Sequence, residues 1–260
     1  MPAAETALIT GASSGLGAEF ARQLATRGCN LILVARRTDR LEAIREEILQ
    51  RHHVEVHVIP ADLGSSEAVH ALHQQIREQG LRIDILINNA GFGAFGEHMQ
   101  IPWQREQQML KLDILALTQL TKLCAQDMLA GNGGYILQLS SIAAYQPSPT
   151  YAAYAAAKSF VLHFGEALNY ELRGTNTSCT VLSPGMTATE FLQVSGQRAT
   201  LYQRLLMMQS PEVVRIGLKA MFKRKPSIVA GRLNALMVWS NRFIPRRWSA
   251  AITHRLMTFG

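Results

Sequence analysis

A chain of 260 residues with 48% hydrophobic and 17% charged residues can bury a substantial core. It fits one large α/β domain, although its length alone would permit two. No stretch offers the roughly 18 uncharged apolar residues of a spanning helix, and the N-terminus lacks the basic and apolar regions of a signal peptide. Composition therefore excludes an integral membrane protein and predicts a soluble, cytoplasmic one.

Short apolar runs alternate with segments of helical spacing along most of the chain. The first run, Thr6–Thr10, precedes apolar residues at helical spacing, and Gly28 ends that helix. Further strands are predicted at Leu31–Ala35, Val54–Ile59, Ile83–Ile87, Tyr135–Leu139 and Ser178–Leu182, and helices at 16–27, 39–50, 66–79, 103–129 and 151–172. Such alternation requires crossover connections, so the strands lie parallel with helices on both faces. The fold class is α/β, with a single doubly wound Rossmann-type parallel sheet.

No linker, internal repeat or low-complexity tract interrupts the chain, which favours one domain over residues 1–260. The three cysteines, Cys29, Cys124 and Cys179, are far apart and sit in apolar segments. They have no metal-ligand spacing, so we expect buried thiols and no metal site.

The glycine-rich stretch after the first strand permits two chemical interpretations. Gly11-Ala12-Ser13-Ser14-Gly15 matches the elbow that presents a nucleophilic serine. That elbow needs an earlier strand to build an oxyanion hole, and no such strand precedes Ser13. Glycines after a first strand instead permit a tight turn and close approach of a pyrophosphate, which the N-terminus of the next helix attracts. The position therefore favours a phosphate cradle, in which Ser13 and Ser14 add hydroxyl donors.

Arg36 and Arg37 follow the second predicted strand, where NAD-binding folds place an acidic residue for the ribose hydroxyls. An acid there would repel a 2′-phosphate, whereas a guanidinium binds one through paired charge-assisted donors. The pair predicts NADP(H) in preference to NAD(H). The alternative is that both arginines only solvate the start of the following helix.

Tyr154 and Lys158 lie four residues apart in an alanine-rich helical segment, so both side chains emerge on one face. A nearby ammonium is expected to lower the tyrosine pKa from about 10 and so make Tyr154 a usable acid and base. Ser141, at the end of the preceding strand, could hydrogen-bond the same substrate oxygen. Tyr151, seven residues before Lys158, lies on roughly the same face, and spacing alone does not exclude it.

The order and separation of these motifs resemble the short-chain dehydrogenase/reductase family, of its NADP-preferring type, from about Ala7 to Phe191. The matching motifs are Thr10-Gly11-x-x-x-Gly15-x-Gly17, Asp62-Leu63, Asn88-Asn89-Ala90-Gly91, Ser141 thirteen residues before Tyr154-x-x-x-Lys158, and Pro184-Gly185-x-x-x-Thr189. By this resemblance, the cofactor site consists of Gly11, Ser13, Ser14, Gly15, Leu16, Gly17, Arg36, Arg37, Asp62, Leu63, Asn89, Ala90, Gly91, Tyr154, Lys158, Pro184, Gly185, Thr187 and Thr189.

The resemblance also implies the catalytic roles. Tyr154 is the general acid/base, Ser141 orients the substrate carbonyl, and Lys158 tunes Tyr154 and holds the nicotinamide ribose. Family members usually have asparagine where this chain has Asp113, and that residue helps hold a water in the proton relay. An ionised Asp113 would oppose phenolate formation at Tyr154. The alternative is that Asp113 only bends or caps its helix.

Charge is segregated along the chain. Ten of the 26 Lys and Arg residues, and none of the 19 acidic ones, lie in the basic amphipathic extension, residues 213–260. A strand is predicted near 227–230, followed by helices that carry large apolar side chains such as Trp239, Phe243 and Trp248. Three interpretations compete: a substrate lid and oligomer surface, an interfacial element at anionic lipid, and a nucleic-acid patch. The first is favoured because this chain segment must close the substrate side, as does the segment 186–210.

Two functional classes remain open from the sequence. The first is an NADPH-dependent oxidoreductase that interconverts a carbonyl and a secondary alcohol on a fairly apolar small-molecule substrate. The alternative is a non-catalytic NADP-binding sensor or scaffold, in which peripheral membrane contact is possible. We expect a homodimer or homotetramer and no nucleic-acid partner.

Overall fold

The computed structural model describes residues 4–197 and 207–258. The strands are β1 (Thr6–Thr10), β2 (Asn30–Ala35), β3 (Val56–Pro60), β4 (Ile85–Asn88), β5 (Gly134–Leu139), β6 (Thr177–Ser183) and β7 (Ser227–Val229). The main helices are α1 (Gly15–Thr26), α2 (Thr38–Leu49), α3 (Ser66–Glu78), α4 (Trp103–Leu110), α5 (Leu117–Ala130), α6 (Ala152–Glu171), α7 (Phe191–Ser195), α9 (Ser210–Phe222), α10 (Arg232–Ser240) and α11 (Arg246–Thr258). All predicted strands and helices are present, with boundaries shifted by one or two residues.

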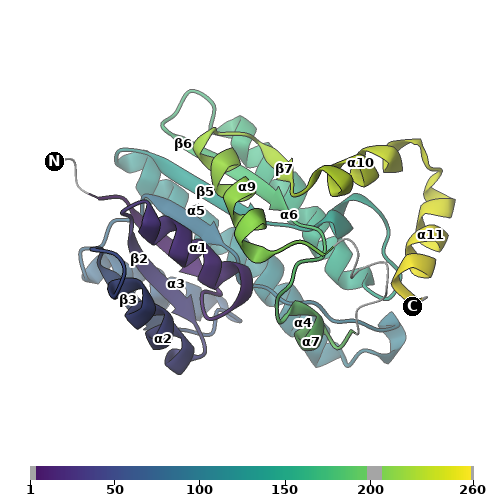
Figure 1. Ribbon diagram of the computed structural model, residues 1–260, viewed down its shortest axis with the longest axis horizontal. Coiled ribbons are helices and arrows are strands. Elements are labelled where there is room, and N and C mark those ends of the chain that lie inside the picture. Colours follow the sequence, from purple (N-terminus) through teal and green to yellow (C-terminus); the bar gives the residue numbers. More distant parts are fainter. Residues whose placement is uncertain (1–3, 198–206, 259–260) are drawn as a thin grey trace.

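The seven strands form one parallel sheet in the order β3-β2-β1-β4-β5-β6-β7 (Figure 1). The chain builds outward from β1 to β3 and then crosses back to place β4 on the other side of β1. Ligands of such sheets bind beyond the carboxyl ends of the strands at this reversal. The predicted doubly wound fold is confirmed.

The sheet is covered on both faces because its strands send alternate side chains in opposite directions. In β1, Ala7 and Ile9 pack into a cluster with α1, α2 and α9, while Leu8 points into the opposite cluster with α3 and α5. All three residues have no exposed surface. The three cysteines are buried and free of disulfides, as predicted.

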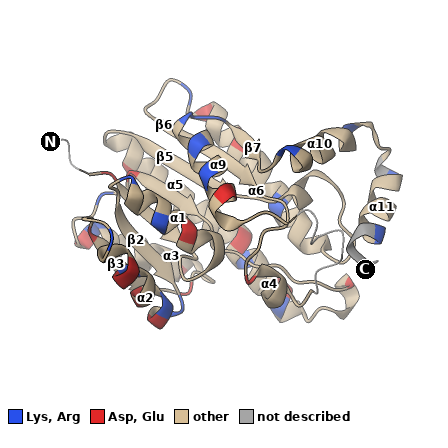
Figure 2. Cartoon of the chain, in the orientation of Figure 1, with Lys and Arg blue, Asp and Glu red and all other residues tan. Residues whose placement is uncertain are grey.

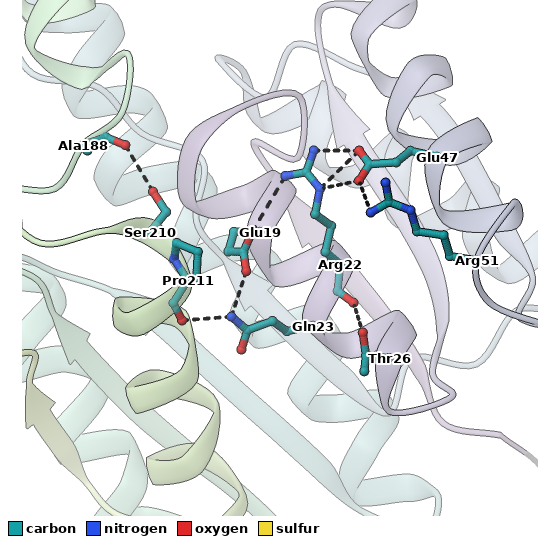
Figure 3. A network of polar contacts seen from close by, with 9 residues as sticks. All are labelled: Glu19, Arg22, Gln23, Thr26, Glu47, Arg51, Ala188, Ser210 and Pro211. Carbon is teal, nitrogen blue, oxygen red and sulfur yellow. Dashed lines mark hydrogen bonds and ion pairs between the residues drawn. The ribbon is translucent and has the colours of Figure 1, made fainter.

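Helices α1 and α9 lie side by side on one face and are joined by polar contacts (Figure 3). Gln23 on α1 donates from Nε2 to the carbonyl oxygen of Pro211 at the start of α9, at 2.9 Å. Next to it, the Ser210 hydroxyl donates to the carbonyl oxygen of Ala188, at 3.2 Å. The packing of α9 on the sheet therefore also anchors the segment that follows β6.

The long helical stretch predicted over 103–129 is continuous but not regular. Between α4 and α5, residues Lys111–Ala116 form a π-helical segment. This turn has one extra residue, a feature often found at functional sites. Within it, Asp113 is completely buried, whereas Leu115 is 63% exposed.

The last helices extend away from the sheet beyond β7, as a projecting part that we call the arm, residues 231–258 (Figure 1). β7 is the strand predicted near 227–230, and it pairs parallel with β6. A short turn of 3-10 helix, Asn241–Phe243, follows α10. Within residues 4–197 and 207–258, none of the helices combines the length and apolar character needed to cross a membrane.

Candidate active site

One cavity of about 1060 Å³ opens at the carboxyl ends of the strands. Its walls include every predicted cofactor and catalytic residue except two, Gly17 and Asp113, which do not line it directly. The residues come from the turns after β1, β2, β3 and β4, from the ends of β5 and β6, and from α6. The fold thus gathers at one site residues that are up to about 180 positions apart in sequence, from Gly11 to Thr189.

The turn after β1 is shaped for close approach of a ligand. Gly11 and Gly15 have φ of +65° and +53°, values that side chains disfavour. A Cβ on Gly11 would lie 2.8 Å from Nδ2 of Asn89, and one on Gly17 would overlap the carbonyl oxygen of Gly11. Ser14, the N-cap of α1, makes no side-chain capping hydrogen bond, so the first N–H groups of the helix remain available to an anion. These features fit the phosphates of a dinucleotide.

The end of β4 is fixed against this turn by Thr10. Its hydroxyl oxygen accepts hydrogen bonds from the backbone N–H groups of Asn89 and Ala90, both at 3.0 Å. Asn89 also donates from Nδ2 to the carbonyl oxygen of Thr10, at 2.8 Å. The glycine turn and the end of β4 are therefore joined by several hydrogen bonds.

Arg37 reaches back over the glycine turn. Its Nη2 donates to the hydroxyl oxygens of Ser13 and Ser14, at 3.1 and 2.8 Å. Its Nη1 donates to Glu190, at 3.1 Å, and Arg40 donates to the other oxygen of the same carboxylate, at 2.6 Å. The guanidinium of Arg37 is therefore held against the glycine turn, and a carboxylate already accepts from one of its donors.

Arg36 is far more exposed than Arg37. Its side chain keeps 74% of its surface, and its closest acidic partner is Asp62, with 3.8 Å between Nη1 and Oδ2. Asp62 is also largely exposed and caps its own turn by accepting a hydrogen bond from the N–H of Gly64. The two arginines of the sequence motif thus differ in how firmly they are positioned.

Tyr154 is largely buried in the wall of the cavity, and its hydroxyl is hydrogen-bonded to Ser141. Burial raises the pKa of the phenol, the negative charge of Asp113 raises it further, and the bond to Ser141 acts in the opposite direction. The prediction of a lowered pKa is therefore wrong for this structure. The reason is that burial and the charge of Asp113 raise this pKa, while the ammonium from which the lowering was expected is paired with Asp113.

Lys158 lies on the same face of α6 as Tyr154, as predicted, with Nζ 5.6 Å from the centre of the phenol ring. The nearest charge to this ammonium is Asp113, with 2.9 Å between Nζ and Oδ2. Lys158 also donates to the carbonyl oxygen of Leu139, at 3.2 Å, while the N–H of Phe92 donates to Oδ1 of Asp113, at 3.1 Å. Burial raises the pKa of the Asp113 carboxyl, and Lys158 counteracts that effect.

Tyr151 has partners different from those of Tyr154. Its hydroxyl lies 2.9 Å from Oγ of Ser195, the last residue of α7, and 2.9 Å from Oε1 of Gln197, two residues further on. Burial raises the pKa of this phenol too. The geometry thus separates two tyrosines that sequence spacing left equivalent: Tyr154 contacts Ser141, and Tyr151 holds a wall of the cavity.

Sequence reasoning missed the contacts of Glu190, Ser195 and Gln197. Glu190 bonds with arginines about 150 positions earlier, and no local pattern marks such a pairing. The arm was expected to close the cavity, and its inner side does line it through residues such as Met237, Val238 and Ile252. Residues 198–206 of the expected substrate-side segment, 186–210, lie outside the described part of the chain.

Comparisons with known proteins agree with this geometry. The family model for short chain dehydrogenase matches residues 5–199. A mouse 17-beta-hydroxysteroid dehydrogenase type 3 is 30% identical over 234 residues, which cover 88% of this chain and 75% of the mouse protein. Sulfoacetaldehyde reductase 2 of Chromohalobacter salexigens is 33% identical over 216 residues, or 80% of this chain and 85% of that protein.

Among solved structures, a short-chain dehydrogenase from Sphingobium yanoikuyae in complex with NADPH superimposes with a TM-score of 0.81. It is 32% identical, and the match covers 92% of this chain and 94% of that one. Both the sequence match and the shared architecture extend over the glycine turn, the strand ends and α6. The chain belongs to the short-chain dehydrogenase/reductase family and is an NAD(P)-dependent oxidoreductase.

Proposed function

We propose that the chain is an NADPH-dependent oxidoreductase that interconverts a carbonyl and a secondary alcohol on a fairly apolar substrate. The observation that carries this proposal is the convergence of Ser141, Tyr154 and Lys158 on one cavity beside the glycine turn. A bound nicotinamide supplies the hydride, and the protein provides position and proton transfer.

Tyr154 is the proposed general acid and base. Its raised pKa keeps the phenol protonated at neutral pH, which suits donation of a proton to a carbonyl oxygen. Ser141 already bonds to this hydroxyl and is placed to share the same substrate oxygen. In the reverse direction, Tyr154 must first lose its proton, so alcohol oxidation is favoured by alkaline conditions.

Lys158 and Asp113 are proposed to act together beneath the tyrosine. Asp113 fixes the ammonium of Lys158 through the ion pair and is itself fixed by the N–H of Phe92. Lys158 is also placed to hold the ribose of the nicotinamide, as the family resemblance implies. The carboxylate of Asp113 disfavours a phenolate at Tyr154, which an uncharged asparagine at this position would not do.

Arg37 supports a preference for NADP(H) because its guanidinium lies beside the hydroxyls of Ser13 and Ser14. Charge-assisted donors in this position suit a phosphate on the adenosine ribose. The remaining cradle, from Gly11 to Gly17 and from Asn89 to Gly91, is proposed to hold the pyrophosphate and the nicotinamide half. Pro184, Gly185, Thr187 and Thr189 are proposed to cover the cofactor from the opposite wall.

The substrate class is proposed from the wall that the arm contributes, where Met237, Val238 and Ile252 present apolar surface. The related proteins have names that refer to a steroid in one case and a small sulfonated aldehyde in the other. The apolar wall supports the first kind of substrate more than the second. We also propose a cytoplasmic homodimer or homotetramer with one domain over residues 1–260.

The experiment that tests this function is a panel of carbonyl compounds with NADPH or NADH, followed by the loss of cofactor absorbance. The panel includes steroid ketones, a 3-oxoacyl thioester, aromatic ketones and sulfoacetaldehyde. We expect reduction of apolar ketones with NADPH and none by the Tyr154→Phe variant. Tight NADPH binding without turnover of any compound would instead support a non-catalytic NADP-binding protein.

A further inference from the structure

The arm carries a row of large apolar side chains that face solvent. Leu233, Leu236, Trp239 and Phe243 are 64%, 58%, 54% and 70% exposed. They are three, three and four residues apart, which places them on one side of α10 and the turn after it. Trp239 and Phe243 also contact each other edge to face, with ring centres 4.9 Å apart. Four adjacent side chains of this size form a continuous apolar surface.

This outer row is not required to build the fold or the cavity. The side of the arm that contributes to the fold and the cavity is the opposite one, where Asn234, Ser249 and Thr253 are buried. Met237 and Val238 of the same helix line the cavity. Trp248 on α11, 57% exposed, adds a further aromatic ring to the outside. Apolar surface of this kind on a projecting part of a protein marks an interaction site.

The charges around the row all have one sign. Arg232 and Arg242 flank it on α10 and the following turn, Arg247 and Arg255 lie on α11, and all four are exposed. No acidic residue occurs anywhere in the arm. Figure 2 shows this directly, with blue but no red along α10 and α11. The partner of this surface must therefore accept apolar side chains and carry negative charge.

We propose that the arm docks onto an anionic phospholipid surface through Leu233, Leu236, Trp239 and Phe243, with its arginines at the headgroups. Amphipathic helices with Trp, Phe and Leu on one side and basic residues beside them lie in the membrane interface. The lipid negative charge complements the arginines, each of which adds to the attraction.

A second copy of the chain fits this surface less well. A symmetric contact through the row would bring Arg232 and Arg242 of each copy against the same residues of the other, and like charges would repel. An acidic peptide fits less well because the row lies on the outer, convex side of a helix, whereas a helical or extended peptide binds in a groove. A flat lipid surface needs no groove.

This docking does not depend on the reaction of the cavity, but it bears on how substrate arrives. The inner side of the arm lines the cavity, while its outer side is the proposed lipid contact. Docking would therefore place the entrance of the cavity beside the bilayer, where apolar carbonyl compounds concentrate.

The test is sedimentation of the full-length protein with vesicles of phosphatidylcholine alone or mixed with phosphatidylglycerol. We expect binding only to the anionic vesicles. This binding should be at least about tenfold weaker near 0.5 M salt than at low salt, because charges are then screened within about 4 Å. The double variant Trp239→Ser/Phe243→Ser should weaken binding about tenfold or more, and Arg232→Gln/Arg242→Gln should reduce both binding and its salt dependence.

The matched control is Leu129→Ser/Tyr170→Ser, which removes two side chains that are 49% and 64% exposed. These residues lie near the C-terminal ends of α5 and α6, at the amino ends of β5 and β6, whereas the arm follows the carboxyl end of β7. Vesicle binding should therefore not change. NADPH titration shows that each variant remains folded. The proposal is overturned by absence of vesicle binding at low salt, or by equal loss of binding in the control. It is also overturned if sedimentation equilibrium shows that the Trp239 and Phe243 variant dissociates an oligomer, or if polyglutamate is bound and vesicles are not.

Discussion

The ammonium of Lys158 lies 2.9 Å from a carboxylate oxygen of Asp113, and both side chains are almost completely buried. In the family this chain belongs to, the position of Asp113 is usually asparagine, which carries no charge. The ion pair changes the electrostatics of Tyr154, because the nearest cation is paired and a negative charge lies close to the phenol. The pH dependence of the reaction is therefore the property in which this enzyme should differ most from its relatives.

Asp113→Asn should shift the alkaline rise of alcohol oxidation to lower pH. Asp113 raises the pKa of Tyr154, so its neutralisation lowers that pKa and makes the phenolate accessible earlier. Carbonyl reduction, which needs the protonated phenol, should then decline at a lower pH. The measurement is kcat/KM against pH in both directions.

Glu106→Gln is the matched control for that experiment. Glu106 is another buried carboxylate on the same helical run, and its partner is His98, 3.0 Å away. This variant should leave the pH profile unchanged even where it lowers stability. Equal shifts in the two variants would contradict the assignment of the effect to Asp113.

Tyr154→Phe and Tyr151→Phe should separate proton transfer from support of the cavity wall. Removal of the Tyr154 hydroxyl should lower kcat about 10²- to 10⁴-fold, the range for loss of a general acid, with cofactor binding nearly intact. Removal of the Tyr151 hydroxyl leaves Ser195 and Gln197 without this partner, which should raise KM more than it lowers kcat. Steady-state kinetics and NADPH fluorescence titration measure both, and a reversal of the two patterns would refute the assignment.

Arg37→Ala should weaken NADPH binding by about 2 kcal/mol, roughly thirtyfold, because charge-assisted hydrogen bonds to the 2′-phosphate are lost. NADH binding should change little. Arg36→Ala is the comparison, and its effect should be smaller because Arg36 is more exposed and less firmly positioned. Titration of both cofactors decides the matter, and a wild-type preference for NADH would contradict the proposed specificity.

Glu190→Gln should tighten NADPH binding and leave NADH binding nearly unchanged. The carboxylate occupies donors of Arg37 and Arg40 that a phosphate would otherwise use. Hydrogen bonds from the two arginines lower the pKa of Glu190. The contact is therefore fully present above about pH 4.3, the usual pKa of a glutamate side chain. It is lost as the pH falls through the lowered pKa. Isothermal titration at neutral pH checks the cofactor effect. Weaker NADPH binding in the variant would mean that Glu190 positions the arginines instead of competing for them.

Local sequence patterns were sufficient to predict the helices and strands and to single out most of the proposed site residues, which line one cavity. Apolar runs predicted each strand, and the glycines after β1 predicted a turn that Gly11 and Gly15 do form with positive φ. The direction in which the pKa of Tyr154 shifts could not be predicted, because the shift depends on burial and on the charge of Asp113, which lies on a different helix. The contact of Glu190 with Arg37 was equally invisible, since only the folded chain brings these residues together.

The π-helical turn around Asp113 makes the length of this segment as important as its composition. The extra residue in Lys111–Ala116 sets the rotation of everything that follows, including which side chains of α5 face the sheet. Deletion of one residue here would restore a regular helix and change the rotation of the segment by about 100°. Either Asp113 would then turn away from Lys158, or α5 would turn away from its packing on the sheet. Insertions and deletions in this turn should therefore be tolerated far less than single substitutions at its exposed position, Leu115.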